Sequence, residues 1–193
     1  MENEWFGVAS DEQKVFGTSF GSSGKQVLQD LLGVIPFDVP FQTESTPSLM
    51  AEKTFTILKN IYDGKDAACA YSVLAVDHLS AFKRKVLAAT FRIPTGYVTS
   101  YGSLARVIGG SPRAVGHVMA TNPFAPIVPC HRVVASDLTL GGYGGGVDVK
   151  FDFLAREKRE HNSTRDILIE GKPLEIFPVE SVLIKLGKNK PIK

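Results

Sequence analysis

Two short helices joined by a glycine turn are predicted in the middle of the chain, and they limit the possible fold more than any other feature. Helix 103–108 ends at Gly109-Gly110. The next helix, 112–121, has Ser111 as its cap and Pro112 at its first position, where the missing N–H would have no partner. This pair predicts a helix-turn-helix, a unit that often binds DNA.

The exposed face of helix 112–121 carries small side chains at Ala114, Gly116 and Ala120. A helix that reads the major groove projects several polar side chains toward the base edges. Small side chains favour close approach to the narrower minor groove, where the protein does not need to read sequence. Arg113 could fill the gap left by an extruded base, or it is an ordinary surface arginine. A transcription regulator is the alternative function for such a unit.

The segment Pro129-Cys130-His131-Arg132-Val133-Val134 sets a thiol beside an imidazole and a guanidinium within an apolar run. The thiolate is the reactive form of cysteine. Neighbouring positive charge is therefore expected to lower the pKa of the Cys130 thiol toward neutrality, and His131 is expected to take the proton. A structural buried cysteine and a cysteine hydrolase are the alternatives, although adjacent residues rarely place a thiol and its base in direct contact.

The 193 residues divide into segments of different charge. Residues 1–77 hold 5 Lys/Arg and 11 Asp/Glu, a net charge of −6, whereas residues 78–160 hold 11 and 5, a net charge of +6. Residues 161–193 have a net charge of +2. Because phosphate neutralisation supplies most non-specific affinity for nucleic acids, the basic middle segment suggests a polyanionic partner, with a solvated surface as the alternative.

Cysteine usage and hydropathy exclude several classes of protein. Cys69 and Cys130 are too few and too scattered for a disulfide framework or a zinc site, so a reducing, cytoplasmic location and no metal are expected. The start of the chain lacks the basic and apolar parts of a signal peptide, and no stretch approaches the ~18 apolar residues of a membrane span. A soluble protein without a membrane partner is predicted.

Hydrophobic spacing predicts three segments, with boundaries near residues 77 and 160. The first, 1–77, is expected to be a small α/β domain with strands 4–10, 14–20 and 67–76 and helices 24–33 and 48–62. The second, 78–160, is expected to be mostly helical, and its first helix begins at the cap Ser80 and stops at Pro94-Thr95-Gly96. Residues 161–193 are an extension of unknown role, either a packing element or a linker.

Residues 79–160 carry motifs that resemble the O6-alkylguanine-DNA alkyltransferases, also called methylated-DNA–protein-cysteine methyltransferases. The matching motifs are Arg113-Ala114-Val115-Gly116, Asn122-Pro123, Ile127-Val128-Pro129-Cys130-His131-Arg132-Val133-Val134, Gly142-Tyr143-Gly144-Gly145-Gly146, Lys150 and Leu154-Ala155-Arg156-Glu157. The resemblance implies an α+β fold. It consists of a small N-terminal ribonuclease-H-like α/β domain, matched only weakly here, and a mostly helical domain with a winged-helix-like helix-turn-helix.

The resemblance implies a chemical role for four residues. Cys130 corresponds to the acceptor thiol, which takes the alkyl group from O6 of a flipped guanine in one irreversible step. His131 resembles the residue that draws the thiol proton through a bridging water, and Glu157 resembles the carboxylate that holds the imidazole. Tyr101 matches the phenol that hydrogen-bonds or protonates the leaving guanine. No metal or organic cofactor is implied.

The resemblance also implies a set of substrate-binding and DNA-binding residues. Arg113 matches the finger that replaces the extruded nucleotide, and Asn122 matches the hinge between the DNA-binding helix and the thiol loop. The pocket wall and the helix face complete the set, with Val133, Tyr143, Gly144, Gly145, Lys150, Ala114, Gly116 and Met119. Gly144 stands where many relatives have serine, so only its backbone N–H can serve there.

The implied partner is double-stranded DNA that contains O6-alkylguanine, bound by a monomer without an obligatory protein partner. A lesion sensor that binds damage without repairing it is an alternative within the same group of proteins. Because such sensors commonly replace the cysteine by tryptophan, Cys130 disfavours this alternative.

Overall fold

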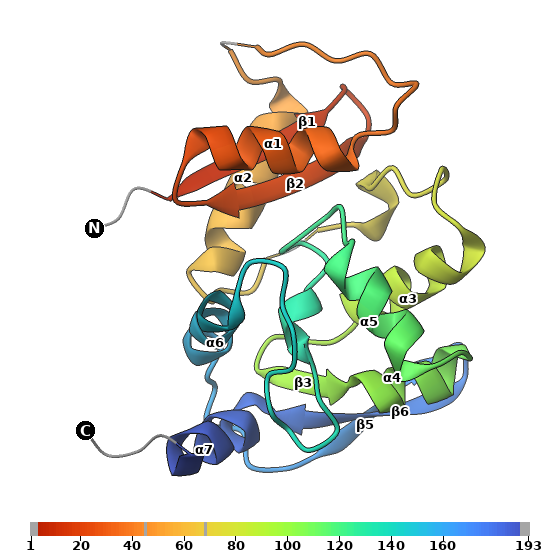
Figure 1. Cartoon of the computed structure of the whole chain (residues 1–193), viewed down its shortest axis with the longest axis vertical. Coiled ribbons are helices and arrows are strands. Elements are labelled where there is room, and N and C mark those ends of the chain that lie inside the picture. Colours follow the sequence, from red (N-terminus) through yellow and green to blue (C-terminus); the bar gives the residue numbers. More distant parts are fainter. Residues whose placement is uncertain (1–3, 45, 68, 190–193) are drawn as a thin grey trace.

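The computed structural model describes residues 4–44, 46–67 and 69–189, which form two units stacked one above the other in Figure 1. The first unit contains β1 (Trp5–Ser10), β2 (Val15–Gly21), α1 (Gly24–Val34) and α2 (Leu49–Tyr62). A 3₁₀ helix, η1 (Tyr71–Val73), lies on the connection between the units. The second unit contains α3 (Ala81–Phe91), β3 (Tyr97–Ser100), α4 (Tyr101–Ile108), α5 (Pro112–Ala120), η2 (Cys130–Arg132), β4 (Val133–Val134), α6 (Val147–Arg156), β5 (Arg165–Ile169), β6 (Lys172–Pro178) and α7 (Val179–Asn189).

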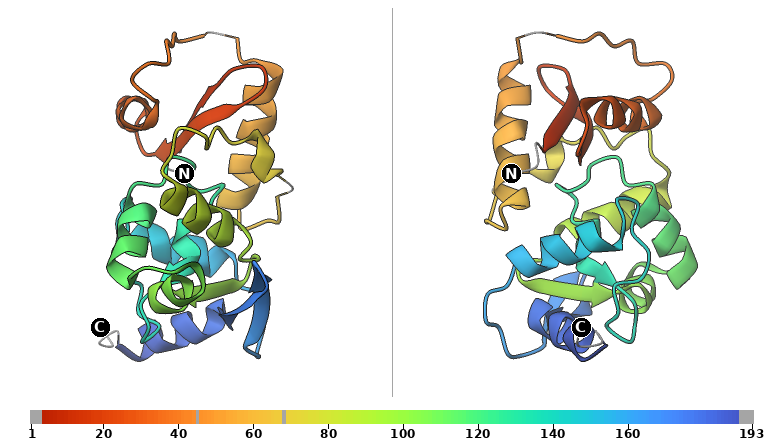
Figure 2. Two further views of the ribbon diagram at one scale, coloured as in Figure 1. Left: turned by 90° about the vertical axis from the view of Figure 1, so that its right-hand side faces the viewer. Right: turned by 60° about the vertical axis from the view of Figure 1, so that its left-hand side comes forward.

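The predicted hairpin and both predicted helices of the first unit are confirmed. β1 and β2 pair antiparallel, and Figure 2 shows the hairpin lying between α1 and α2. α2 begins after Ser48, whose side chain accepts a hydrogen bond from the N–H of Ala51 at 3.2 Å, as a capping residue does. α1 runs one residue past Gly33, the position at which it was expected to stop.

The predicted strand at residues 67–76 is wrong, for the part of it that lies within the described residues. The far edge of β2 is already used at two points. The N–H of Ala75 donates to the carbonyl of Val15 at 2.8 Å, and the N–H of Thr18 donates to the carbonyl of Pro123 at 2.9 Å. The segment therefore reaches β2 only at one isolated bridge, between Leu74 and Val15, after the turn of η1. A loop of the second unit occupies the same edge at Thr18, so a third strand cannot extend along it.

The second unit contains a four-stranded sheet that a mostly helical prediction did not include. Its strand order is β4-β3-β6-β5, with β3 parallel to β4 and antiparallel to β6, and with β5 antiparallel to β6. The buried side chain of Thr99, in β3, donates to the carbonyl of Glu175 in β6 at 2.7 Å. Residues 165–178 thus belong to the same sheet as the strand that precedes α4.

The helix starts of the second unit follow the serine caps in the sequence. The side chains of Ser80, Ser100 and Ser111 each accept a hydrogen bond from an N–H in the first turn of α3, α4 and α5. α3 ends at Phe91, before the Pro94 stop. The turn between α4 and α5 requires glycine, because Gly110 has φ of +121° and a Cβ there would lie 2.9 Å from the ring of Phe82.

The two units share one hydrophobic core, and one close approach of their backbones depends on a glycine. Gly64, after α2, has φ of +72°, and a Cβ at this position would lie 2.2 Å from the carbonyl oxygen of Arg156 at the end of α6. A second, smaller cluster packs α7 against the sheet and α6, with Val98, Val134, Leu154, Val179 and Val182 buried in it. The first unit and the C-terminal elements therefore hold α6 from two sides.

Candidate active site

Cys130 begins η2, at the end of a loop that is tied back to α5. The side-chain amide of Asn122 donates to the carbonyl of Val128 at 2.8 Å, and its oxygen accepts from the N–H of Phe124 at 3.0 Å. The N–H of Cys130 donates to the same Val128 carbonyl at 2.8 Å. Asn122 therefore lies between the DNA-binding helix candidate and the thiol loop, where the sequence placed it.

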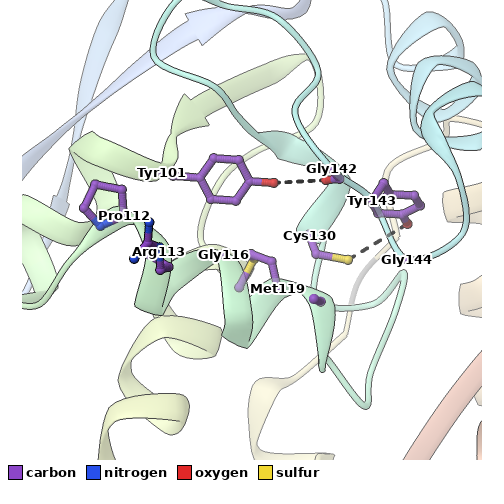
Figure 3. Close-up of a pocket in the computed structure, with 10 residues that line it drawn as sticks. Tyr101, Pro112, Arg113, Gly116, Met119, Cys130, Gly142, Tyr143 and Gly144 are labelled. Carbon is purple, nitrogen blue, oxygen red and sulfur yellow. Dashed lines mark hydrogen bonds between the residues drawn. The ribbon is translucent and has the colours of Figure 1, made fainter.

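The Cys130 side chain reaches a cavity of about 530 Å³ between α5 and the glycine-rich loop 141–146. Figure 3 shows Arg113 and Pro112 toward one end of this cavity and Cys130 and Tyr143 toward the other. The cavity is lined by Tyr101, Pro112, Arg113, Gly116, Met119, Ala120, Cys130, Gly142, Tyr143 and Gly144. On the loop side, two of the three lining residues, Gly142 and Gly144, are glycines that offer only backbone atoms, whereas Tyr143 adds a side chain.

The thiol of Cys130 does not have the lowered pKa that its neighbours in the sequence predict. Its residue is only 4% exposed, and burial raises the pKa of the thiol, against weaker opposing effects of Asn122, Tyr143 and Lys150. The thiol donates a weak hydrogen bond to the Tyr143 hydroxyl at 3.9 Å. The Arg132 guanidinium is directed to other partners, so the sulfur at neutral pH is a protonated thiol that needs a base.

His131, Glu157 and Arg132 form a buried network next to the thiol. The Nε2 atom of His131 lies 2.8 Å from Oε1 of Glu157. Arg132 donates from Nε to Oε2 of Glu157 at 2.9 Å and from Nη2 to Oε1 at 2.7 Å, and its Nη1 donates to the Ile93 carbonyl at 2.6 Å. Among the described residues, the buried Nδ1 atom of His131 has no hydrogen-bond partner, so this nitrogen is available to accept a proton.

The charges in this network follow from burial and pairing. Burial lowers the pKa of His131 and outweighs the opposite effect of Glu157, so the imidazole is neutral at neutral pH. Burial alone would raise the pKa of Glu157, but His131 and Arg132 lower it to about 2. Because the imidazole is neutral, the positive charge that keeps Glu157 ionised at neutral pH is the Arg132 guanidinium. Glu157 is therefore a fixed negative charge beside a neutral base.

Tyr101 lines the cavity, and Lys150 lies next to Tyr101 outside the lining. The Tyr101 hydroxyl donates to the Gly142 carbonyl at 3.2 Å, and burial raises the pKa of this phenol to about 12. Lys150 is fully buried, and its ammonium donates to the carbonyls of Val133 and Leu140 at 2.7 and 2.6 Å and to the Tyr101 hydroxyl at 3.4 Å. Burial lowers the pKa of Lys150 to about 8.

The structure brings half of the predicted site residues to one cavity, because its lining includes Tyr101, Arg113, Gly116, Met119, Cys130, Tyr143 and Gly144. His131, Asn122 and Glu157 are not part of the lining of this cavity. Val133, Gly145 and Lys150 do not line it, and Lys150 lies beneath it as a support for the loop. Ala114 is half-buried on α5 outside the lining, whereas Gly116 and Met119 face the cavity. Arg113 is exposed at the start of α5.

Sequence reasoning missed two residues that contact the His131–Glu157 pair. Arg132 is the main partner of Glu157, and Phe153 stacks on the imidazole. A helical repeat would have found Phe153, because Lys150, Phe153, Leu154 and Glu157 recur at the spacing of one buried helix face. Nothing in the sequence shows that the Arg132 side chain points away from the sulfur.

Two negative findings concern the described residues alone. No group of three or more His, Cys, Asp or Glu side chains in this part of the chain could hold a metal ion. No described helix is both long enough and apolar enough to cross a lipid bilayer.

Residues 81–159 match the sequence model of the 6-O-methylguanine DNA methyltransferase, DNA binding domain. Over 65 residues the chain is 62% identical to the methylated-DNA–protein-cysteine methyltransferase of Pyrobaculum aerophilum, an alignment that covers 34% of this chain and 44% of that protein. The protein of the same name from Methanothermobacter thermautotrophicus is 33% identical over 141 residues, which cover 73% of this chain and 78% of the relative.

The fold is also similar to that of a solved protein–DNA complex. The crystal structure of Mycobacterium tuberculosis OGT in complex with DNA superposes with a TM-score of 0.58 at 28% sequence identity. The superposition covers 78% of this chain and 84% of that chain. The likeness therefore extends beyond the thiol motif to both units of the α+β fold.

Proposed function

Because the chain belongs to the methylated-DNA–protein-cysteine methyltransferase family, whose members repair DNA by direct reversal, we propose that Cys130 takes the alkyl group from O6-alkylguanine in double-stranded DNA. The observation that carries the proposal is the position of the Cys130 sulfur. It faces a cavity bordered by the DNA-binding helix candidate, with a neutral base and a fixed carboxylate behind it.

The proposed reaction begins with removal of the thiol proton. His131 is the base, and its Nδ1 atom takes the proton by way of a water molecule, since no direct hydrogen bond joins the two side chains among the described residues. The ionised Glu157 then stabilises the imidazolium at 2.8 Å, as the third member of other nucleophile–base–orienter sets does. Because burial raises the pKa of the Cys130 thiol, this transfer is required before attack.

The second step is an in-line displacement at the alkyl carbon. The sulfur forms a bond to that carbon while the bond between the carbon and O6 breaks, and the electron pair leaves with the guanine. Tyr101 can donate a proton to the leaving base, because its pKa of about 12 keeps the phenol protonated at neutral pH. The product thioether is stable, so each polypeptide reacts once.

The proposed DNA contacts lie on α5. Three small residues, Ala114, Gly116 and Ala120, lie on the exposed or half-buried side of α5, next to the exposed His117, and they would permit close approach to the minor groove. Arg113, exposed at the start of α5, would fill the space of the extruded nucleotide. The β5–β6 hairpin lies beside α4, where Lys172 Nζ donates to the Val107 carbonyl at 3.3 Å. This arrangement supports the winged-helix-like description, while a ribonuclease-H-like first unit stays a prediction.

The proposal is tested by intact-mass measurement after incubation with a duplex that contains one O6-methylguanine. The protein is expected to gain one methyl group, and Cys130→Ser is expected to gain none. Cys69→Ser is the matched control, since Cys69 is the second free thiol of the chain and should not affect transfer. A lesion sensor would bind the duplex without gaining mass, and methylation of the Cys130→Ser variant would contradict the assignment of the acceptor.

Two further features remain proposals of the same kind. A monomer is expected to suffice, because the thiol, the base and the helix face come from one chain. A cytoplasmic location with access to genomic DNA agrees with the proposed substrate. Sedimentation of the protein bound to a short duplex tests whether a monomer suffices. The complex should have the mass of one protein chain and one duplex.

A further inference from the structure

Phe153 of α6 stacks on the imidazole ring of His131. The two ring centroids lie 4.7 Å apart with an angle of 22° between the planes, and both residues are 0% exposed. Phe153 precedes Glu157, the C-cap residue of α6, by four residues, so both lie on the same side of the helix. One helix therefore supplies both the ring that covers a face of His131 and the carboxylate that binds its edge.

The Phe153 ring is held in place by aromatic residues of the first unit. Phe20 of β2 meets it at 5.1 Å and 78°, and Tyr62 of α2 meets it at 5.8 Å and 87°, both edge-to-face arrangements. Tyr62 is itself packed edge-to-face on Phe6 of β1 at 5.5 Å. The Phe153 ring is thus supported directly by β2 and α2, and through Tyr62 by β1. None of these elements lines the cavity.

The charges that face His131 oppose one another. Arg132 and Lys150 disfavour a proton on the imidazole, and so does burial, while Glu157 favours it. The Cys130 thiol is the group that must give up its proton. The face of an aromatic ring carries negative potential and attracts a cation, most strongly where water is excluded. An aliphatic side chain of similar size would fill the same space without this attraction.

We propose that Phe153 is a positioning residue for the transfer reaction, whose ring face fixes the plane of His131 and stabilises the imidazolium formed when His131 takes the Cys130 proton. The inference rests on the proposed role of His131 as the base. It also gives the first unit a part in the reaction, because Phe20 and Tyr62 hold the Phe153 ring without touching the substrate.

The test replaces Phe153 by fluorinated phenylalanines, which keep the shape of the ring and progressively weaken the negative potential of its face. The rate of methyl transfer from an O6-methylguanine duplex in a single turnover is measured across the pH range. A trifluorinated ring is expected to slow transfer about tenfold at neutral pH. Since a less stabilised imidazolium has a lower pKa, the acid-side midpoint of the pH profile should move down by about one unit.

Matched controls separate an electrostatic effect from a packing effect. The same fluorinated residue at Phe91, whose ring partner is Tyr71, should change neither the rate nor the midpoint. Phe153→Leu should slow transfer at least as much as the fluorinated ring. Thermal unfolding of each variant is measured alongside, and the fluorinated proteins are expected to unfold at the temperature of the unmodified protein.

The possible outcomes separate the two proposals. An unmodified protein that gains no methyl group would overturn the proposed function itself. If the unmodified protein reacts and the fluorinated series shows the same rate and the same acid-side midpoint, only the role of Phe153 is overturned. A slower rate with an unmoved midpoint would assign Phe153 to packing alone and would also overturn the proposal.

Discussion

Arg132 and Glu157 form a buried ion pair in which Nε lies 2.9 Å from Oε2 and Nη2 lies 2.7 Å from Oε1. The arginine two residues after Cys130 therefore binds the carboxylate that lies behind the base. Its two parallel hydrogen bonds have the geometry that makes arginine the preferred partner of a carboxylate. The Arg132 charge consequently keeps Glu157 ionised and does not act on the Cys130 thiol.

Loss of the Arg132 side chain should destabilise the fold. Arg132→Met leaves the Glu157 carboxylate buried without its main counter-charge, and breaking such a pair costs about 3–5 kcal/mol of the free energy of unfolding. Urea unfolding at neutral pH measures the loss. Arg106→Met is the control, because Arg106 is exposed on α4 and its replacement should leave the free energy within about 0.5 kcal/mol.

Acid should weaken the protein through Glu157. The pKa of this carboxyl falls from an ordinary 4.5 to about 2 on folding, so its contribution to stability is fully present above pH 4.5 and is lost as the pH falls toward 2. The shift corresponds to about 3 kcal/mol. The free energy of unfolding of the unmodified protein should therefore drop more steeply over this interval than that of Glu157→Gln. Parallel curves for the two proteins would show that Glu157 is not the group responsible.

Removal of the base should slow alkyl transfer in a way that high pH reverses. For His131→Gln, the rate at neutral pH should fall about a hundredfold or more, the range expected for loss of a general base. The thiol should ionise unaided only above its ordinary pKa of 9.0, since burial raises the value. Single-turnover rates measured up to alkaline pH should then converge on those of the unmodified protein, and a constant difference would argue against His131 as the base.

Tyr101→Phe should separate proton donation from thiol reactivity. The variant loses the hydroxyl that can protonate the leaving guanine, and its transfer rate should fall about a hundredfold. Alkylation of Cys130 by iodoacetamide has a leaving group that needs no proton, so its rate should stay within about twofold. Equal losses in both reactions would indicate that Tyr101 supports the cavity instead.

Arg113→Ala should affect duplex DNA more than a free substrate. The proposed task of Arg113 is to hold the extruded base out of the helix, so the variant should repair a duplex about tenfold more slowly. Its reaction with free O6-benzylguanine should be unchanged. Arg106→Ala removes the same charge from the neighbouring helix and controls for the general attraction of basic residues to phosphate. Equal losses of rate on both substrates would contradict the proposal that Arg113 fills the space of the extruded base.

Local signals in the sequence predicted the helices well, because each depends on residues close together in the chain. Ser80 and Ser111 cap the helices at which they were expected to act. The strands of the second unit were missed. β4 has two residues and β3 has four, too few for an alternating pattern, whereas β5 and β6 lie in the segment 161–193, to which no role was assigned. The pairing of β3 with β6 joins residues more than 70 positions apart, a relationship that no local pattern contains.

In the candidate site too, features that depend on local motifs were predicted, and features that depend on distant contacts were not. Cys130, Tyr101, Arg113 and Gly144 reach one cavity, as their motifs indicated. The pKa of the Cys130 thiol was predicted in the wrong direction because sequence neighbours were treated as spatial neighbours, whereas Arg132 turns toward Glu157. Lys150 was expected to bind the substrate or DNA, but its side chain is fully buried and supports the loop. The depth of α6 within the fold, which the sequence does not show, decides where this ammonium lies.

The pairing of β6 with β3 has a practical consequence for anyone who shortens this protein. A product that stops near residue 160 would leave the hydrogen-bonding edge of β3 without a neighbour and would open the cluster around Val98 and Val134 to water. Unprotected strand edges recruit other chains. Such a fragment should therefore precipitate during expression, even though it retains every residue of the thiol motif.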